Sequence, residues 1–192
     1  ASVRQAIRMI EAGAEYVRFT AQGEREARNL GEIRKELNAQ GYTTPLVADI
    51  HFNPRAADAA AEVVEKVRIN PGNYVDKVKT FDLLEYTDEE YAAELQKIRD
   101  RFVPFLDICK KHGTAIRIGV NHGSLSDRIM SRYGDTPEGM VASCMEFLRI
   151  CRDENFPDVV ISIKASNTVV MVRTVRLLVR TMEAEDMHYP LH

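Results

Sequence analysis

No run of apolar residues in this 192-residue sequence approaches the roughly 18–20 consecutive positions that a membrane-spanning helix needs. An excess of basic charge is also missing. The formal net charge is -3, which argues against broad binding to nucleic acid or to an anionic membrane. The first residues, "ASVRQAIRMIEAGAEY", are amphipathic and unlike a signal peptide. They lack an initiator methionine, and we interpret the chain as a piece that begins inside a longer protein.

Cysteine is scarce, and its spacing excludes the common metal and redox motifs. The three cysteines, Cys109, Cys144 and Cys151, form no C-x-x-C pair. Cys144 and Cys151 are seven positions apart, on one face of a predicted helix and among apolar residues. We expect buried thiols in a reducing compartment. Walker and G-x-G-x-x-G motifs are absent as well, so a nucleotide ligand is not indicated.

What the sequence does contain is a regular alternation of strands and helices, typical of parallel strands joined by right-handed crossovers. The predicted strands are "EYVRFT" (15–20), "PLVADIHF" (45–52), "KVRIN" (66–70), "TAIRIGVN" (114–121) and "DVVISIKAS" (158–166), and "HYPLH" (188–192) begins another. The segment at about 74–112 is an excursion beyond the repeat within a single domain. Pro104 is expected to kink or split its helix.

Residue parity gives each strand an apolar face and a polar face. The polar set is Arg18, Thr20, Asp49, His51, Arg68, Asn70, Arg117, Gly119, Asn121, Ser162, Lys164 and Ser166. A doubly wound sheet is covered by helices on both faces, and both should be apolar. A barrel differs, because its inner face can line a pocket at the carboxyl ends of the strands. We therefore predict an α/β fold of the (β/α) barrel type.

The polar face is mainly cationic. It carries Arg18, Arg68, Arg117 and Lys164, with Asp49 as the clear acid. Guanidinium forks match phosphate oxygens, so the pattern indicates a small ligand with one or two phosphates. Asn70 and Asn121 would add neutral donors. The alternative is salt-bridged packing inside a barrel, and Asp49 can pair with an arginine under either interpretation.

The histidines need separate treatment. His51 is in phase with the cations and is assigned to the site. Asp49 and His51 could also be two metal ligands, but the other strand ends offer few further ligands, so we predict no metal. We assign His112 and His122, which lie beside glycines in predicted loops, to structure.

Two loops follow the strands of the polar face and could bring backbone N–H groups to an anion. "INPGN" (69–73) is predicted to form a type II turn. "NHGSLSDR" (121–128) is predicted to cap a helix with Ser124 or Ser126.

Three stretches resemble one known family closely. They are "PLVADIHFNPRAADAAAEVVEKVRINPGN", "IRIGVNHGSLSDRIMSRYGDTPEGMVASCMEFLR" and "ISIKASNT". The family is the 4-hydroxy-3-methylbut-2-enyl diphosphate synthases, iron–sulfur oxidoreductases of the methylerythritol phosphate route to isoprenoids. The resemblance covers nearly the whole chain, and the 74–112 segment resembles the long, plant-like form of the family.

The resemblance implies a TIM-type barrel that holds 2-C-methyl-D-erythritol 2,4-cyclodiphosphate. Asp49 and His51 would orient the substrate and the cations, as the catalytic pair. The implied substrate-binding residues are Arg18, Arg68, Asn70, Arg117, Asn121, Lys164 and Ser166. The family also implies a [4Fe–4S] cluster on a separate C-terminal domain, ferredoxin or flavodoxin as electron donor, and a homo-oligomer. The expected location is the bacterial cytoplasm, or the plastid for a plant protein.

Compared with that family, residues 1–192 correspond to a partial (β/α)8 barrel. The first strand is expected before Ala1, the seventh begins at "HYPLH" and the eighth is absent, as is the iron–sulfur domain. The isolated segment is therefore expected to bind anions without turnover. Alternatives are another phosphate-handling barrel, such as a Lys164 Schiff-base aldolase or a pteroate-synthase-like transferase, and a non-catalytic fragment that pairs with itself.

Overall fold

The computed structural model describes residues 1–76 and 85–192. Part of the predicted excursion at about 74–112 therefore lies outside the described residues. In the described part, no helix has both the length and the apolar character needed to cross a membrane.

Five parallel strands form one sheet in which every strand lies beside the next one in the sequence. They are β1 (Val17–Ala21), β2 (Leu46–Ile50), β3 (Lys66–Ile69), β4 (Ala115–Asn121) and β5 (Val159–Lys164). A doubly wound sheet reverses its strand order at a switch point, whereas this order never reverses. The five predicted strands and the barrel-type winding agree with this sheet. A parallel bridge between Ile161 and Leu191 places the start of a sixth strand beside β5, as predicted for "HYPLH".

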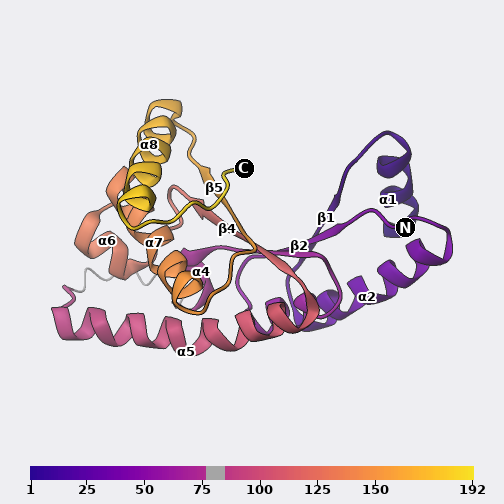
Figure 1. Ribbon diagram of the computed structural model, residues 1–192, viewed down its shortest axis with the longest axis horizontal. Helices are drawn as coiled ribbons and strands as arrows, with labels where there is room; N and C mark the ends of the chain where they lie inside the picture. The colour runs from indigo at the N-terminus through magenta and orange to yellow at the C-terminus, as the bar shows by residue number, and fades with distance from the viewer. Residues whose placement is uncertain (77–84) are drawn as a thin grey trace.

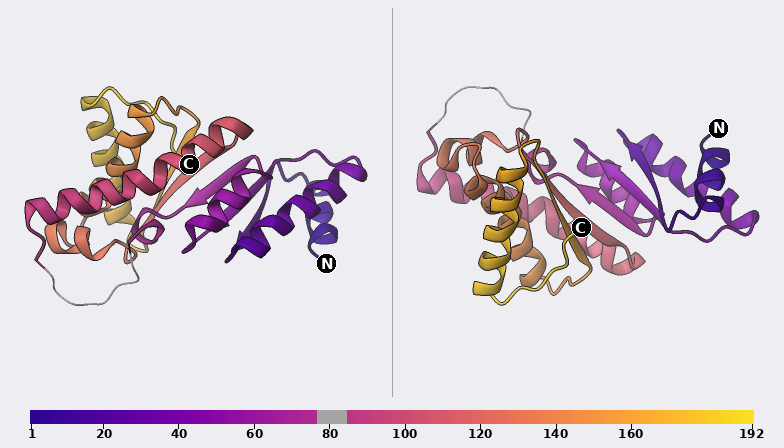
Figure 2. Two further views of the ribbon diagram at one scale, coloured as in Figure 1. Left: turned by 90° about the horizontal axis from the view of Figure 1, so that it is seen from below. Right: turned by 90° about the horizontal axis from the view of Figure 1, so that it is seen from above.

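Eight helices occur among the described residues, mostly between the strands. They are α1 (Ser2–Glu11), α2 (Glu24–Ala39), α3 (Pro54–Ala61), α4 (Pro71–Tyr74), α5 (Asp88–His112), α6 (Asp127–Tyr133), α7 (Pro137–Asp153) and α8 (Thr168–Ala184). Figure 1 shows α5 running along one side of the strands. The helices α1 and α2 lie near the N-terminus at the right of the view, and α7 and α8 lie at the left. In Figure 2, seen from below, α5 crosses in front of the strands.

The apolar strand faces form the core against these helices. Ala56, Ala57, Ala59, Ala60 and Ala61 are all buried, and their small side chains let α3 pack closely on its neighbours. The rings of Tyr74, Phe102, Phe105 and Phe147 form an aromatic cluster with centroids 5.0–6.0 Å apart. This packing leaves the polar strand face as the side on which a ligand site can form.

Of the two outcomes expected at Pro104, a kink or a split, the split does not occur. α5 continues through Pro104 to His112. Thr87 and Glu90 form a capping box at its start, and Phe102 and Phe105 are fully buried on either side of the proline. Buried side chains on both sides hold the helix together although proline removes one backbone hydrogen bond.

The type II turn predicted at "INPGN" is wrong, because this segment forms the short helix α4. Asn70 Oδ1 accepts a hydrogen bond from the Gly72 backbone N–H at 3.2 Å and so caps the helical turn. Gly72 does not adopt the positive φ that a type II turn would require.

Candidate functional site

One row of charged side chains crosses the polar face of the sheet. Asp49 on β2 is in register with Arg68 on β3, and Arg68 is in register with Arg117 on β4. Registered residues of parallel strands point to the same side. The structure therefore brings these three predicted site residues together.

Asp49 is the shared anion of this row. Its Oδ1 accepts a hydrogen bond from Arg68 Nη1 at 3.1 Å, and its Oδ2 lies 3.4 Å from Arg18 Nε. His51 Nε2 lies 3.5 Å from Asp49 Oδ1. Asp49 is buried, so its charge needs these partners. The expected pairing of Asp49 with an arginine is confirmed.

Arg68 lies deep in the face. Its side chain is 8% exposed, against 50% for Arg18. Besides its bond to Asp49, Arg68 Nη2 donates to the Gly119 carbonyl oxygen at 3.1 Å, and Nη1 lies 3.5 Å from His51 Nδ1. Arg68 thus forms the floor of the face, while Arg18 stands at its rim.

The pKa of Arg117 shows that positive charge is in excess on the polar strand face. Its Nε donates to Ser162 Oγ at 3.0 Å. Burial lowers the pKa of the Arg117 guanidinium, and the positive charges of Arg18 and Arg68 lower it further. Asp49 offsets only part of this repulsion. A bound anion would offset more of it.

The far end of the chain faces the same space. Leu191 makes the bridge to β5, and His192 follows it. The positive charge of Arg117 lowers the pKa of His192, as do burial and then the charges of Lys66 and Arg18. Residues from β1, β3 and β4 therefore act on a side chain beyond β5.

The loops after β3 and β4 are joined by hydrogen bonds. Asn70 Nδ2 and Asn73 Nδ2 donate to Ser124 Oγ at 2.8 and 3.1 Å. A Cβ added to Gly72 would lie 1.8 Å from the Ser124 carbonyl oxygen, so the loops also touch through their backbones. Both polar atoms of the Asn70 side chain have partners within the protein. Its role in substrate binding stays a prediction, and its observed role is to hold these loops.

The three remaining predicted site residues lie around the ends of β4 and β5. Asn121 is in register with Lys164, and Lys164 and Ser166 are exposed. Nearby, His122 in the loop after β4 has its Nε2 3.4 Å from Oδ1 of Asp135, which lies between α6 and α7. Lys164 can therefore reach a ligand at the rim, whereas His122 is paired with Asp135.

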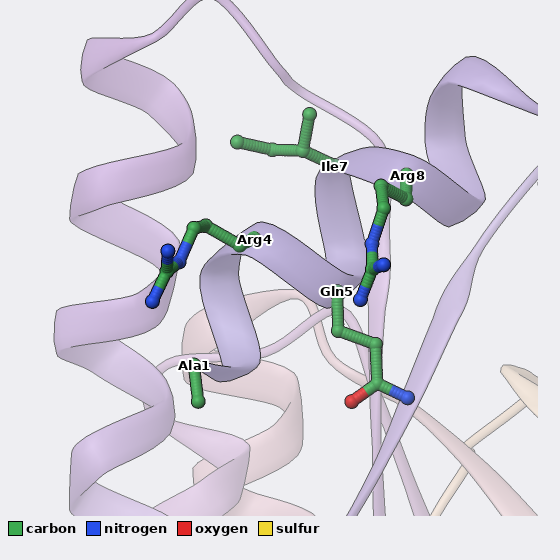
Figure 3. A pocket seen from close by; sticks show the side chains of 5 residues that line it. All are labelled: Ala1, Arg4, Gln5, Ile7 and Arg8. Atoms are coloured by element: carbon green, nitrogen blue, oxygen red, sulfur yellow. The ribbon is translucent and has the colours of Figure 1, made fainter.

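A separate hollow of about 570 Å³ lies at the N-terminus (Figure 3). It is lined by Ala1, Arg4, Gln5, Ile7 and Arg8, all from α1 and its first flanking residue. None of the predicted site residues lines it, so this hollow is distinct from the polar strand face.

The cysteines of the chain do not fit an iron–sulfur cluster. Cys109, Cys144 and Cys151 are buried and free. Burial raises the pKa of Cys109 and of Cys144 to about 12, which disfavours the thiolate that ligates iron. Within residues 1–76 and 85–192, no group of three or more His, Cys, Asp or Glu residues is placed to hold a metal ion.

Comparison with known proteins gives the family. The GcpE TIM-barrel domain family matches residues 1–192. The chain belongs to this family. The predicted partial TIM-type barrel and the sequence resemblance are thereby confirmed.

The relatives of this GcpE-family chain are curated proteins named 4-hydroxy-3-methylbut-2-en-1-yl diphosphate synthase (flavodoxin). The chain is 92% identical to that of Parabacteroides distasonis, 74% to that of Bacteroides fragilis and 52% to that of Protochlamydia amoebophila. Each alignment covers 100% of this chain, but only 31%, 31% and 29% of the respective relative. The chain thus spans about a third of the length of these relatives.

A crystal structure of 3-keto-D-glucoside 4-epimerase, YcjR, from E. coli has a similar fold. Its TM-score is 0.53 at 12% identity, over 98% of this chain and 84% of that one. At this identity the likeness concerns the fold alone.

Several residues of the site were missed by sequence reasoning. Parity alone could have found Lys66, which lies two positions before Arg68 on the same strand face. Gly119 was placed on the face, but its contact with Arg68 was not foreseen. Ser124 was considered only as a cap, whereas Ser126 caps α6 and Ser124 joins the loops.

Proposed function

We propose that this chain is the substrate-binding barrel portion of a 4-hydroxy-3-methylbut-2-en-1-yl diphosphate synthase of isoprenoid biosynthesis. The substrate would be 2-C-methyl-D-erythritol 2,4-cyclodiphosphate, whose ring is reductively opened with loss of water. Support comes from the family match and from relatives that carry this enzyme name over the whole chain. Residues 1–192 would form one segment of the barrel domain.

The observation that carries the proposal is the row Asp49–Arg68–Arg117, with Arg18 beside it. Arg18 and Arg68 share the buried Asp49 carboxylate, while Arg117, in register with Arg68, experiences the charges of both arginines as repulsive. A diphosphate bears charge of the opposite sign and oxygen atoms that match guanidinium forks. The face is therefore suited to a compact ligand with two phosphoryl groups.

The residues at the rim of the polar strand face and the residue at its floor would have different tasks. Arg18 and Lys164 are exposed enough to contact phosphate oxygens directly. Arg117 is partly exposed and is aimed by Ser162. Arg68 contributes mainly a fixed positive charge beneath the ligand, because protein groups already occupy two of its nitrogen atoms.

His51 would orient substrate and cations. One ring nitrogen lies 3.5 Å from Asp49 Oδ1 and the other 3.5 Å from Arg68 Nη1. A ring that carries its proton on Nε2, beside Asp49, would leave Nδ1 to accept from Arg68. Asp49 would in turn keep Arg18 and Arg68 aligned.

The reducing power would come from outside the described residues. A [4Fe–4S] cluster would supply the electrons, and the described cysteines do not fit as its ligands. We propose a flavodoxin as donor, since the relatives' names carry that word. We further propose a location in the bacterial cytoplasm, because the relatives reported above are bacterial. The homo-oligomer that the family resemblance implies stays a prediction.

The test is turnover by the full-length protein that carries this segment. Incubated anaerobically with the cyclodiphosphate and reduced flavodoxin, it should form 4-hydroxy-3-methylbut-2-enyl diphosphate, detected by mass spectrometry. Arg117→Ala should lower kcat/KM at least about tenfold, as expected for loss of one charge-assisted contact. Arg4→Ala, in α1, is the matched control and should leave it unchanged. Absence of product would overturn the proposal, as would borohydride trapping of a phosphorylated aldehyde on Lys164.

A further inference from the structure

Gly119 stands in the middle of β4 directly against the guanidinium of Arg68. A Cβ added at Gly119 would lie 2.5 Å from Arg68 Nε, 3.1 Å from Nη2 and 3.2 Å from Cζ. Real Cβ atoms do not approach other heavy atoms within 2.5 Å, so any larger residue would displace the arginine. The glycine therefore leaves the space that Arg68 occupies.

Backbone conformation does not explain this glycine. Gly119 lies within a regular strand and is not among the glycines with positive φ. Glycine in a strand interior weakens the strand, and it often marks a close approach of another group. Here the approaching group is the side chain of a proposed site residue from the neighbouring strand.

The contacts of Arg68 show what this space achieves. The guanidinium extends from β3 across β4, where Nη2 donates to the Gly119 carbonyl oxygen at 3.1 Å. At the same time Nη1 donates to Asp49 on β2. One side chain thus bridges three strands and lies flat against the sheet. A methyl group at position 119 would lift the Arg68 guanidinium off the sheet. The guanidinium would then lose these contacts and move towards His51 and the proposed ligand position.

We propose that Gly119 is a positioning residue that keeps Arg68 flat and so sets the depth of the anion site. The site then has a low floor, made by Arg68 and Gly119, beneath the exposed cations of the rim. This inference rests on the proposed function for the identity of the ligand, but the positioning itself concerns any diphosphate.

A double-mutant cycle in the full-length protein tests the positioning. Binding of inorganic pyrophosphate and of the cyclodiphosphate is measured by calorimetry for wild type, Gly119→Ala, Arg68→Ala and the double variant. Gly119→Ala should weaken binding of both ligands about tenfold in the wild-type background and less than about twofold in the Arg68→Ala background. Equal losses in both backgrounds would overturn the proposal, because the glycine would then act without the arginine.

The matched control is Gly31→Ala on α2. Its added Cβ would meet only the Val63 side chain, with a closest approach of 3.2 Å, away from the strand face. This variant should bind both ligands as wild type does, and a matching loss there would contradict the inference. If Gly119→Ala does not fold, the double variant should recover folding, because the arginine that clashes is gone. If neither Gly119→Ala nor the double variant folds, that result also contradicts the proposed positioning role of Gly119.

The two ligands separate this inference from the proposed function. If the cycle holds for pyrophosphate while the cyclodiphosphate does not bind, the positioning stands and the proposed substrate fails. If the cyclodiphosphate binds but its affinity does not respond to Gly119→Ala, the positioning fails and the substrate stands.

Discussion

Asn70 Nδ2 donates a hydrogen bond to Ser124 Oγ at 2.8 Å, and this bond ties the loop after β3 to the loop after β4. Asn73 Nδ2 donates to the same oxygen at 3.1 Å. Both loops follow strands of the cationic face. The Ser124 hydroxyl, together with the close backbone approach of Gly72 to Ser124, holds these loops and the edge of the candidate site.

Replacing Ser124 with alanine removes the acceptor of both amide groups. Ser124→Ala should lower the free energy of unfolding by about 1–3 kcal/mol, because two partly buried donors lose their partner. Urea denaturation followed by circular dichroism measures the change. Ser131→Ala, at an exposed position of α6, is the control and should change stability by less than about 0.5 kcal/mol. Similar values for the two variants would show that the loops are held by other contacts.

The buried ion pair between Arg128 on α6 and Glu146 on α7 provides a second test, which concerns stability alone. Arg128 Nη1 and Nη2 donate to the two carboxylate oxygens of Glu146 at 2.6 and 2.8 Å, and the Tyr91 hydroxyl donates to Glu146 Oε1. Glu146→Gln removes the bidentate anionic partner of the buried Arg128 and leaves it a neutral amide and Asp76, whose Oδ2 lies 3.7 Å from Arg128 Nη2. The free energy of unfolding should fall by about 3–5 kcal/mol in thermal or chemical denaturation.

The exposed pair between Arg149 and Glu185 is the matched control for that variant. Arg149 donates to both Glu185 oxygens, at 2.6 and 3.0 Å, so the pair has the same chemistry in a more exposed setting. Glu185→Gln should cost less than about 1 kcal/mol. A cost equal to that of Glu146→Gln would contradict the assignment of the large effect to burial.

The thiols should be unreactive in the folded protein. Cys109 and Cys144 are fully buried, and burial raises the pKa of each to about 12. At pH 8 the folded chain should therefore react negligibly with an aromatic disulfide reagent, while all three cysteines react once denaturant is added. Rapid labelling of any thiol without denaturant would show that the helices do not cover it.

The same shifts predict a loss of stability at alkaline pH. In the unfolded chain a cysteine ionises near its ordinary pKa of 9.0, whereas folded Cys109 and Cys144 stay protonated up to about pH 12. The unfolded state then binds fewer protons than the folded state, so the free energy of unfolding falls as pH rises from 9 to 12. Each thiol contributes a slope of up to about 1.4 kcal/mol per pH unit. Cys109→Ala should flatten the decline measured by urea denaturation, and an unchanged slope would contradict the shift.

Much of the fold was predictable because strand periodicity is local. The two-residue repeat placed Arg18, Asp49, Arg68 and Arg117 on one face, and the structure brings them together. Contacts between loops were not predictable, because the bond from Asn70 to Ser124 depends on how two separate segments fold.

The local sequence rules failed for the same reason, namely contacts with segments that are distant in the sequence. Proline and glycine signals predicted a kinked or split helix at Pro104, of which the split is absent, and a type II turn at "INPGN". Buried phenylalanines keep α5 continuous, and an asparagine cap turns "INPGN" into α4. In both places, contacts that a short sequence window does not contain outweigh the local preference. Gly119 is similar, since only the neighbouring strand shows why it carries no side chain.

The most direct test of the cationic face as a diphosphate site is calorimetric titration of the chain with 2-C-methyl-D-erythritol 2,4-cyclodiphosphate. The account predicts that wild type and Arg4→Ala bind with equal affinity, and that Arg117→Ala binds at least about tenfold more weakly. Equal affinity in all three, or no binding by wild type, would contradict it.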